Sequence, residues 1–273
     1  MFFIELKRAL KRKSFLIALT IGMILCIGDI LQNNMFYIER SFLNCYSDTY
    51  YQDFMHSFVA SPVGFFALIN STEITNLFVS LIPILCAVSF GDSYIEDLNS
   101  GFLKNILMRY PKTKYLNIKF LVNFTISGIT IALPLLIQLI FLLITHPLIK
   151  PYKLYDAVFV GDFNINLYLN HPVLYILLWV FIAFIFSGII GNIALSISII
   201  NRNKFIAVVA PFILTMVVHI LFSLLGLKCY SVVGVLTFSE SGLKVYHLVI
   251  TFIVMFLLTY VPFYLGGKSN EII

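Results

Sequence analysis

The sequence predicts an all-α integral membrane protein with six transmembrane helices, and three observations predict it. The 273 residues are 60% apolar and 11% charged, whereas a soluble domain carries about 25% charged residues. The apolar residues form long runs near the ~20 residues that a helix needs to cross a bilayer, and not the short alternating segments of a transmembrane β-barrel. Lysine and arginine are divided unequally between the connecting segments. We therefore expect one membrane domain, residues 1–273, with almost no soluble mass.

Each span follows from its own apolar run. The expected spans are residues 14–32, 74–91, 119–145, 172–200, 205–226 and 243–265. The second is the most interrupted, because it contains Thr75, Asn76 and Ser80 and is broken by Pro83. The first has a basic flank like a signal peptide, but its apolar run is long for one and no small-x-small cleavage site follows. We therefore expect the first span to be retained.

The basic residues predict the orientation of the spans. With the N-terminus in the cytoplasm, thirteen of the eighteen Lys and Arg residues fall on inner segments: Lys7, Arg8, Lys11, Arg12, Lys13, Lys104, Arg109, Lys112, Lys114, Lys119, Arg202, Lys204 and Lys268. The other five, on outer segments, are Arg40, Lys150, Lys153, Lys228 and Lys244. This distribution obeys the positive-inside rule and places both termini in the cytoplasm. Bases strung along one membrane face do not predict nucleic-acid binding.

The first twelve residues predict an interfacial helix before the first span. One face is apolar and comprises Phe2, Phe3, Leu6, Ala9 and Leu10, and the other comprises Glu5, Arg8 and Arg12 with Lys7 and Lys11 at its border. Such a helix lies on the inner leaflet with its bases toward lipid headgroups. The alternative is a plain positive-inside anchor.

Three connecting segments are expected on the outer side: residues 33–73, 146–171 and 227–242. The first is rich in tyrosine, which suits the headgroup zone. The last is too apolar for a solvated loop and too short to span, so it either dips into the membrane or packs on the outer face of the protein. A disulfide between Cys45 and Cys229, both on this side, is a hypothesis. The four cysteines show no metal-ligand spacing.

Residues 92–118 form a polar inner loop with an unexpected apolar stripe. The apolar residues recur at helical spacing: Ile95, Leu98, Phe102 and Ile106. We expect a helix, a kink at Gly101, a second short helix over 102–109 capped by Ser100, and a stop before Pro111. An apolar stripe on such a segment either lies on lipid or docks in the groove of a partner.

The string "SYIEDLNSGFLKNILMRYPKTKYLNIKFLV" resembles the cytoplasmic loop of ABC-2-type permeases, the membrane subunits of bacterial ATP-binding-cassette transporters. The family loop has acids, Ser-Gly, an aliphatic stretch, arginine, a proline or basic turn, then tyrosine and lysine before the next span. The matching positions here are Glu96, Asp97, Ser100, Gly101, Leu103 to Leu107, Arg109, Pro111, Tyr115 and Lys119. The layout agrees over the whole chain, but the motif covers only this loop.

The resemblance implies a permease subunit that pairs with a second permease chain, identical or not, and with two copies of a cytoplasmic ATPase that binds ATP and Mg²⁺. The loop between spans two and three would be the coupling helix, seated in a groove of the ATPase, and the N-terminal helix would be the family's connecting helix. The coupling residues would be Tyr94, Glu96, Asp97, Leu98, Ser100, Gly101, Phe102, Leu103, Ile106 and Arg109.

No catalytic motif is found in the sequence. The segment most similar to a phosphate-binding loop is "PFYLGGKS" at 262–269. It has Pro262 in place of the first glycine and follows an expected transmembrane helix. Hydrolase signatures are also missing. The acids Asp92, Glu96 and Asp97 cluster at the inner membrane edge, as polar anchors of the second span or as contacts to the ATPase. We therefore expect any ATPase to be a separate chain. We expect no cofactor or metal on the chain described here.

Polar residues inside the spans are candidates for a substrate path, because they are costly in hydrocarbon. The candidates are His219, Asn123, Gln138 and Asn192. Each of these side chains could equally tie two helices together. Asp29, near the outer end of the first span, is expected at the outer interface.

The sequence thus predicts ATP-driven export across the bacterial cytoplasmic membrane, with an antimicrobial or signalling peptide or another amphipathic compound as substrate. The alternative is a non-transporting sensor or assembly protein that uses residues 92–109 only to dock a cytoplasmic partner. Substitutions of Gly101 and Leu103 are expected to separate these two functions.

Overall fold

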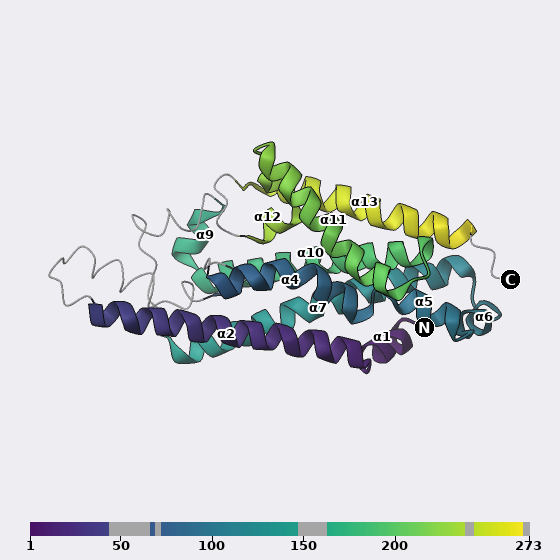
Figure 1. Ribbon diagram of the computed structural model, residues 1–273, viewed down its shortest axis with the longest axis horizontal. Coiled ribbons are helices and arrows are strands. Elements are labelled where there is room, and N and C mark those ends of the chain that lie inside the picture. The colour runs from purple at the N-terminus through teal and green to yellow at the C-terminus, as the bar shows by residue number, and fades with distance from the viewer. Residues whose placement is uncertain (44–65, 69–71, 147–162, 238–242, 270–273) are drawn as a thin grey trace.

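The computed structural model describes residues 1–43, 66–68, 72–146, 163–237 and 243–269, and all regular structure in these ranges is helical (Figure 1). The described residues contain six helices that are long and apolar enough to cross a membrane: α2 (Lys13–Leu43), α4 (Glu73–Phe90), α7 (Lys112–Thr145), α10 (Pro172–Ile200), α11 (Lys204–Leu224) and α13 (Val245–Ser269). Each of the six predicted spans corresponds to one of these helices. The third is longer than predicted, because α7 begins directly after Pro111, whose extended backbone forms its N-cap.

The shorter helices lie before, between and after the long ones. They are α1 (Phe2–Leu10), α5 (Ser93–Asn99), α6 (Phe102–Leu107), α9 (Ile165–Asn170), the 3-10 turn η2 (Lys228–Tyr230) and α12 (Val232–Leu236). Figure 1 places α1, α5, α6 and the C-terminal end of α13 at one end of the bundle, and α9 toward the other. The Nζ of Lys112 donates to the backbone oxygen of Lys268 at 3.2 Å, which ties the end of α13 to the start of α7.

The centre of the bundle is formed by α4, α7 and α10. At least half of the residues in the most apolar part of each are buried, whereas less than a fifth of the corresponding residues of α11 and α13 are buried. The exposed side chains of α11 and α13 are mainly leucine, isoleucine and valine. Such a surface requires an apolar environment, which a lipid bilayer provides.

The two central helices α7 and α10 approach closely through paired glycines. A Cβ added to Gly128 would lie 2.6 Å from the ring of Phe184, and one added to Gly188 would lie 2.7 Å from the ring of Phe124. Each phenylalanine thus lies over the glycine of the opposite helix, and the two rings meet edge to face at 5.9 Å. Small residues at a helix crossing allow this close backbone approach in membranes.

The apolar segment after α11 packs into the protein. All five residues of α12 are buried, and Ser231 caps the helix by accepting a hydrogen bond from the amide of Gly234. Of the two alternatives for the segment after α11, burial of its described residues 232–236 favours packing against the bundle, where α12 contacts α4, α10 and α11. Cys45 lies outside the described residues, so the proposed Cys45–Cys229 disulfide stays a hypothesis.

Candidate functional site

The polar loop after α4 folds as two short helices separated by Gly101. Gly101 has a φ of +70°, in the left-handed region that glycine adopts without strain, and it forms the N-cap of α6. The predicted kink is therefore confirmed. The predicted cap is wrong: Ser100 ends α5, and its hydroxyl lies 3.5 Å from the backbone oxygen of Asp97 instead of bonding the first turn of α6.

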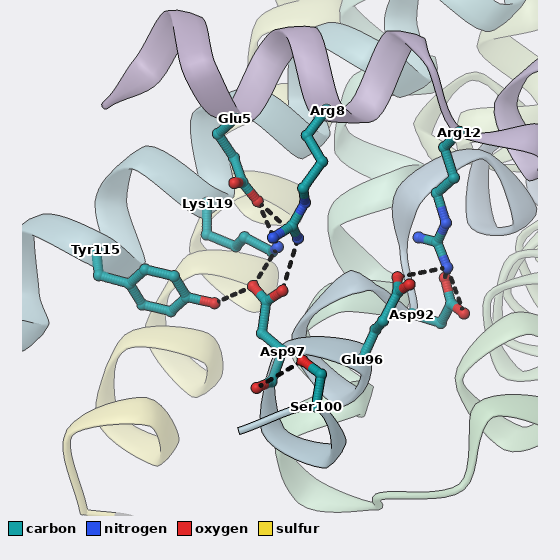
Figure 2. Close-up of polar contacts among 9 residues, drawn as sticks. All are labelled: Glu5, Arg8, Arg12, Asp92, Glu96, Asp97, Ser100, Tyr115 and Lys119. Atoms are coloured by element: carbon teal, nitrogen blue, oxygen red, sulfur yellow. Dashed lines mark hydrogen bonds and ion pairs between the residues drawn. The ribbon is translucent and has the colours of Figure 1, made fainter. Parts of the chain in front are cut away.

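Asp97 on α5 is the centre of a buried ion cluster that joins three helices (Figure 2). Its Oδ1 accepts a hydrogen bond from Arg8 Nη2 at 2.6 Å, and its Oδ2 accepts from Lys119 Nζ at 2.7 Å and from the Tyr115 hydroxyl. Lys119 Nζ also donates to Glu5 Oε1 at 2.7 Å, and Arg8 lies 3.0 Å from the same oxygen. We call Glu5, Arg8, Asp97, Tyr115 and Lys119 the ion cluster.

The ion cluster is electrically balanced, with two carboxylates facing two cations. Lys119 is fully buried, and Asp97 and Glu5 are 1% and 5% exposed. Charges at such burial are tolerated only when they are paired and hydrogen-bonded. Burial alone would lower the pKa of Arg8, but the neighbouring charges of Asp97 and Glu5 outweigh it and raise that pKa, so the guanidinium stays charged.

A second set of ion pairs is formed by Arg12, which lies between α1 and α2. Arg12 Nη2 lies 2.7 Å from Asp92 Oδ1 and 3.1 Å from Glu96 Oε2. The ring of Phe90 lies between the two sets of charges. Its centroid is 4.7 Å from Lys119 Nζ and 5.6 Å from the guanidinium carbon of Arg12. All three acids of the loop therefore bind bases within this chain. For Asp92 and Asp97 this favours the role of anchors, because their carboxylates are already engaged.

The orientation of α1 differs from the prediction. Glu5 is buried and Arg8 and Arg12 point toward α5, whereas Phe3 and Ile4 are 80% and 75% exposed. Of the bases predicted to face lipid headgroups, Arg8 and Arg12 thus face the protein, whereas Lys7 and Lys11 are exposed. The reason is that Asp92, Glu96, Asp97 and Lys119 supply partners for the polar face of α1, and leaving those charges unpaired would cost more than exposing two apolar side chains.

The predicted coupling residues divide into three groups by exposure. Tyr94, Asp97 and Leu103 are buried; Leu98, Gly101 and Ile106 are half-buried; Glu96, Ser100, Phe102 and Arg109 are exposed. The buried three face the interior and are not available to a partner in this arrangement. Leu103 packs in an apolar cluster with Tyr94, Tyr115 and Leu116.

Of the exposed coupling residues, Phe102 and Arg109 border a groove between α1 and α6. The groove has a volume of about 400 Å³ and is lined by Met1, Ile4, Glu5, Phe102, Asn105, Ile106, Met108, Arg109 and Tyr110. Met108 is 80% exposed and was missed by the sequence analysis, as were Arg8, Arg12, Tyr115 and Lys119 as members of a site. Tyr115 and Lys119 are spaced by one helical turn before an apolar run, which is the signal that could have identified them.

The predicted substrate-path residues tie helices together. Asn123 Nδ2 donates to Asn192 Oδ1 at 2.8 Å, which joins α7 to α10, and His219 Nδ1 lies 2.8 Å from Ser231 Oγ, which joins α11 to α12. Gln138 Nε2 donates to Asp29 Oδ2 at 3.0 Å. Asp29 is 1% exposed and lies among α2, α4 and α7, and its expected depth at the outer interface stays a prediction.

Comparisons of the chain with protein-family models, with curated proteins and with solved structures give no significant match.

Proposed function

We propose that this chain is the permease subunit of an ABC-2-type exporter in a bacterial cytoplasmic membrane, driven by a separate ATPase. Two permease chains, identical or not, would work with two ATPase subunits that bind ATP and Mg²⁺. The substrate would be a peptide or another amphipathic compound. Residues 1–10 and 92–111 would then lie in the cytoplasm, as the distribution of basic residues indicates.

The observation that carries this proposal is the attachment of α5 to α1 and α7 through the ion cluster. A coupling element has to transmit a displacement into the membrane helices without coming loose from them. Asp97 is bonded to Arg8 on α1 and to Lys119 on α7; the bond to Lys119 is buried away from water, and the bond to Arg8 is partly buried. Buried charged pairs are costly to separate, so α5, α1 and the inner end of α7 would move as one unit.

The surface beyond the ion cluster supports docking of a partner. Phe102, Met108 and Arg109 are exposed around the groove between α1 and α6. Exposed aromatic, methionine and arginine side chains are enriched in protein interfaces. A loop that served only to connect two spans would have no need of this apolar surface at its tip.

The proposal is tested by purifying the tagged full-length chain from its native membrane in mild detergent and identifying its partners by mass. We expect a stoichiometric ATPase subunit with the wild-type chain, and its loss with Phe102→Asp and with Met108→Asp. Phe205→Asp is the matched control, because Phe205 is 73% exposed at the start of α11 and lies outside the groove. It should retain the ATPase.

Other results would replace this proposal. A chain that purifies alone, or with a kinase or protease, would favour the sensor or docking function. An ATPase that is retained by both groove variants would show that it docks elsewhere on the chain.

A further inference from the structure

A second buried carboxyl group lies far along α7 from the ion cluster and has different partners. Asp29 Oδ1 accepts hydrogen bonds from the hydroxyls of Thr72 and Thr75, both at 2.7 Å, and its Oδ2 accepts from Gln138. Thr72 is the N-cap of α4, where it accepts from the amide of Thr75. Asp29 on α2 therefore binds the N-terminus of α4 and the middle of α7.

No cation balances Asp29 among the residues that the structure describes. None of the ion pairs found there includes it. In sequence, α2 has no other charged residue between Lys13 and Glu39, and α7 has none after Lys119. The nearest titratable groups on these helices are the buried thiol of Cys26, one turn away on α2, and the exposed carboxylate of Glu73 on α4.

The surroundings of Asp29 suit both charge states of its carboxyl group. The ionised form is stabilised by the neutral side chains of Thr72, Thr75, Gln138 and Asn33 and by the positive end of the α4 dipole. The neutral form needs an acceptor for its proton, and one is present: Gln138 is 2% exposed, and its Oε1 is buried without a hydrogen-bond partner in the described structure. A rotation of the Gln138 amide by half a turn exchanges Nε2 for Oε1 at the carboxyl group.

We propose that Asp29 is an exchangeable proton-binding site within the membrane domain, with Gln138 donating to the carboxylate and accepting from the acid. One proton is taken up by Asp29 Oδ2, and the amide of Gln138 turns to accept it. Release of the proton reverses both steps, so no other group changes its charge. Thr72 and Gln32 beside the site are only half-buried, which gives the proton a short route to the surface.

Proton uptake at Asp29 weakens the attachment of α4 to α2. The Thr72 and Thr75 hydroxyls lose a charged acceptor, and hydrogen bonds to charged groups are the stronger ones. The remaining polar contact of this helix end with α2 is the amide of Ile74, which donates to Gln32 Oε1 at 3.3 Å. The site thus links the proton concentration at one end of the bundle to the packing of α4.

The test is infrared difference spectroscopy of the purified full-length chain between acidic and alkaline pH. The carbonyl stretching band of a protonated carboxyl group is well separated from that of a carboxylate. We expect a reversible band that is lost in Asp29→Asn and retained in Glu73→Gln, the matched control. In Gln138→Leu the band should move to higher frequency, because the acid then lacks its acceptor.

Identical difference spectra for the wild-type chain and Asp29→Asn would overturn the proposal. If Asp29→Asn does not fold, Gln138→Leu decides: an unshifted carboxyl band in this variant would also overturn it. Both infrared measurements are independent of any ATPase or substrate. Their outcome therefore tests the proton-binding site separately from the transport proposal.

Discussion

Lys119 and Asp97 form an ion pair with 2.7 Å between Nζ and Oδ2, and neither side chain has appreciable exposed surface. The pair joins α7 to α5, and Glu5 extends it to α1. Three segments separated in sequence thus converge on one buried ammonium group.

Replacing Lys119 with methionine should destabilise the protein strongly. The change leaves two carboxylates with only Arg8 as a cation, and removing one partner of a buried pair costs about 3–5 kcal/mol. Thermal unfolding in detergent measures this. Lys114→Met is the control, since Lys114 is exposed, and it should change stability by no more than about 0.5 kcal/mol.

A double variant separates the ion pair from general damage to the fold. Lys119→Met combined with Asp97→Asn removes both charges, so its cost should be smaller than the sum of the two single costs. Additive costs would show that the two side chains do not interact in the folded protein.

Arg8 on α1 and Arg12 just after it should hold this helix to the bundle, and Lys7 and Lys11 should not. Arg8→Gln and Arg12→Gln each remove charged hydrogen bonds to α5, worth about 1.5–3 kcal/mol. Amide hydrogen exchange over residues 2–10 should therefore accelerate in both variants. Lys7→Gln and Lys11→Gln, on the exposed face, should leave it unchanged. Equal acceleration in all four would mean that α1 is held by total charge and not by these pairs.

The sequence could predict the spans and the kink, but not the side of α1 that faces the protein. Spans follow from local hydropathy, and the break at Gly101 follows from a residue that adopts positive φ without strain. The amphipathic pattern of residues 1–12 defines two faces without saying which is buried. That choice depends on Asp92 and Asp97, 80 or more residues away from their arginine partners, and on Lys119, which the sequence indicated only as a basic residue of the inner side and as a position of the loop motif.

The exposure of the coupling residues has the same origin. Periodicity placed Phe102 and Leu103 on one apolar stretch, yet Phe102 is 38% exposed and Leu103 is 1% exposed. The difference arises because α6 packs one side against Tyr94 and Tyr115, which belong to other helices. No local pattern distinguishes the two sides of so short a helix.

Leu103→Asp should consequently act on stability and not on docking. An aspartate at this position buries a charge without a partner, and the transfer of even a neutral polar group costs about 1–3 kcal/mol in proteins. We expect a lower unfolding temperature and reduced yield. Phe102→Asp, at a more exposed position, should leave the unfolding temperature nearly unchanged. A stable Leu103→Asp chain would mean that this side of α6 is not buried in solution.

Gly188→Ala should disturb the contact between α7 and α10. The new Cβ would lie 2.7 Å from the ring of Phe124 and 2.8 Å from its backbone oxygen. A ring can rotate away, but a backbone oxygen moves only if the helices separate. Overpacking of this kind costs about 1–3 kcal/mol, to be measured by thermal unfolding in detergent.

The control for this change is another helical glycine with room beside it. A Cβ on Gly28 would meet only Ile74 Cδ1 at 3.4 Å, an ordinary contact. Because alanine favours a helix over glycine by about 0.5–1 kcal/mol, Gly28→Ala should be neutral or stabilising. Adding Phe124→Leu to Gly188→Ala should recover only part of the loss, since it relieves the ring and leaves the backbone oxygen in place. Full recovery would show that the side chain alone sets the distance between these helices.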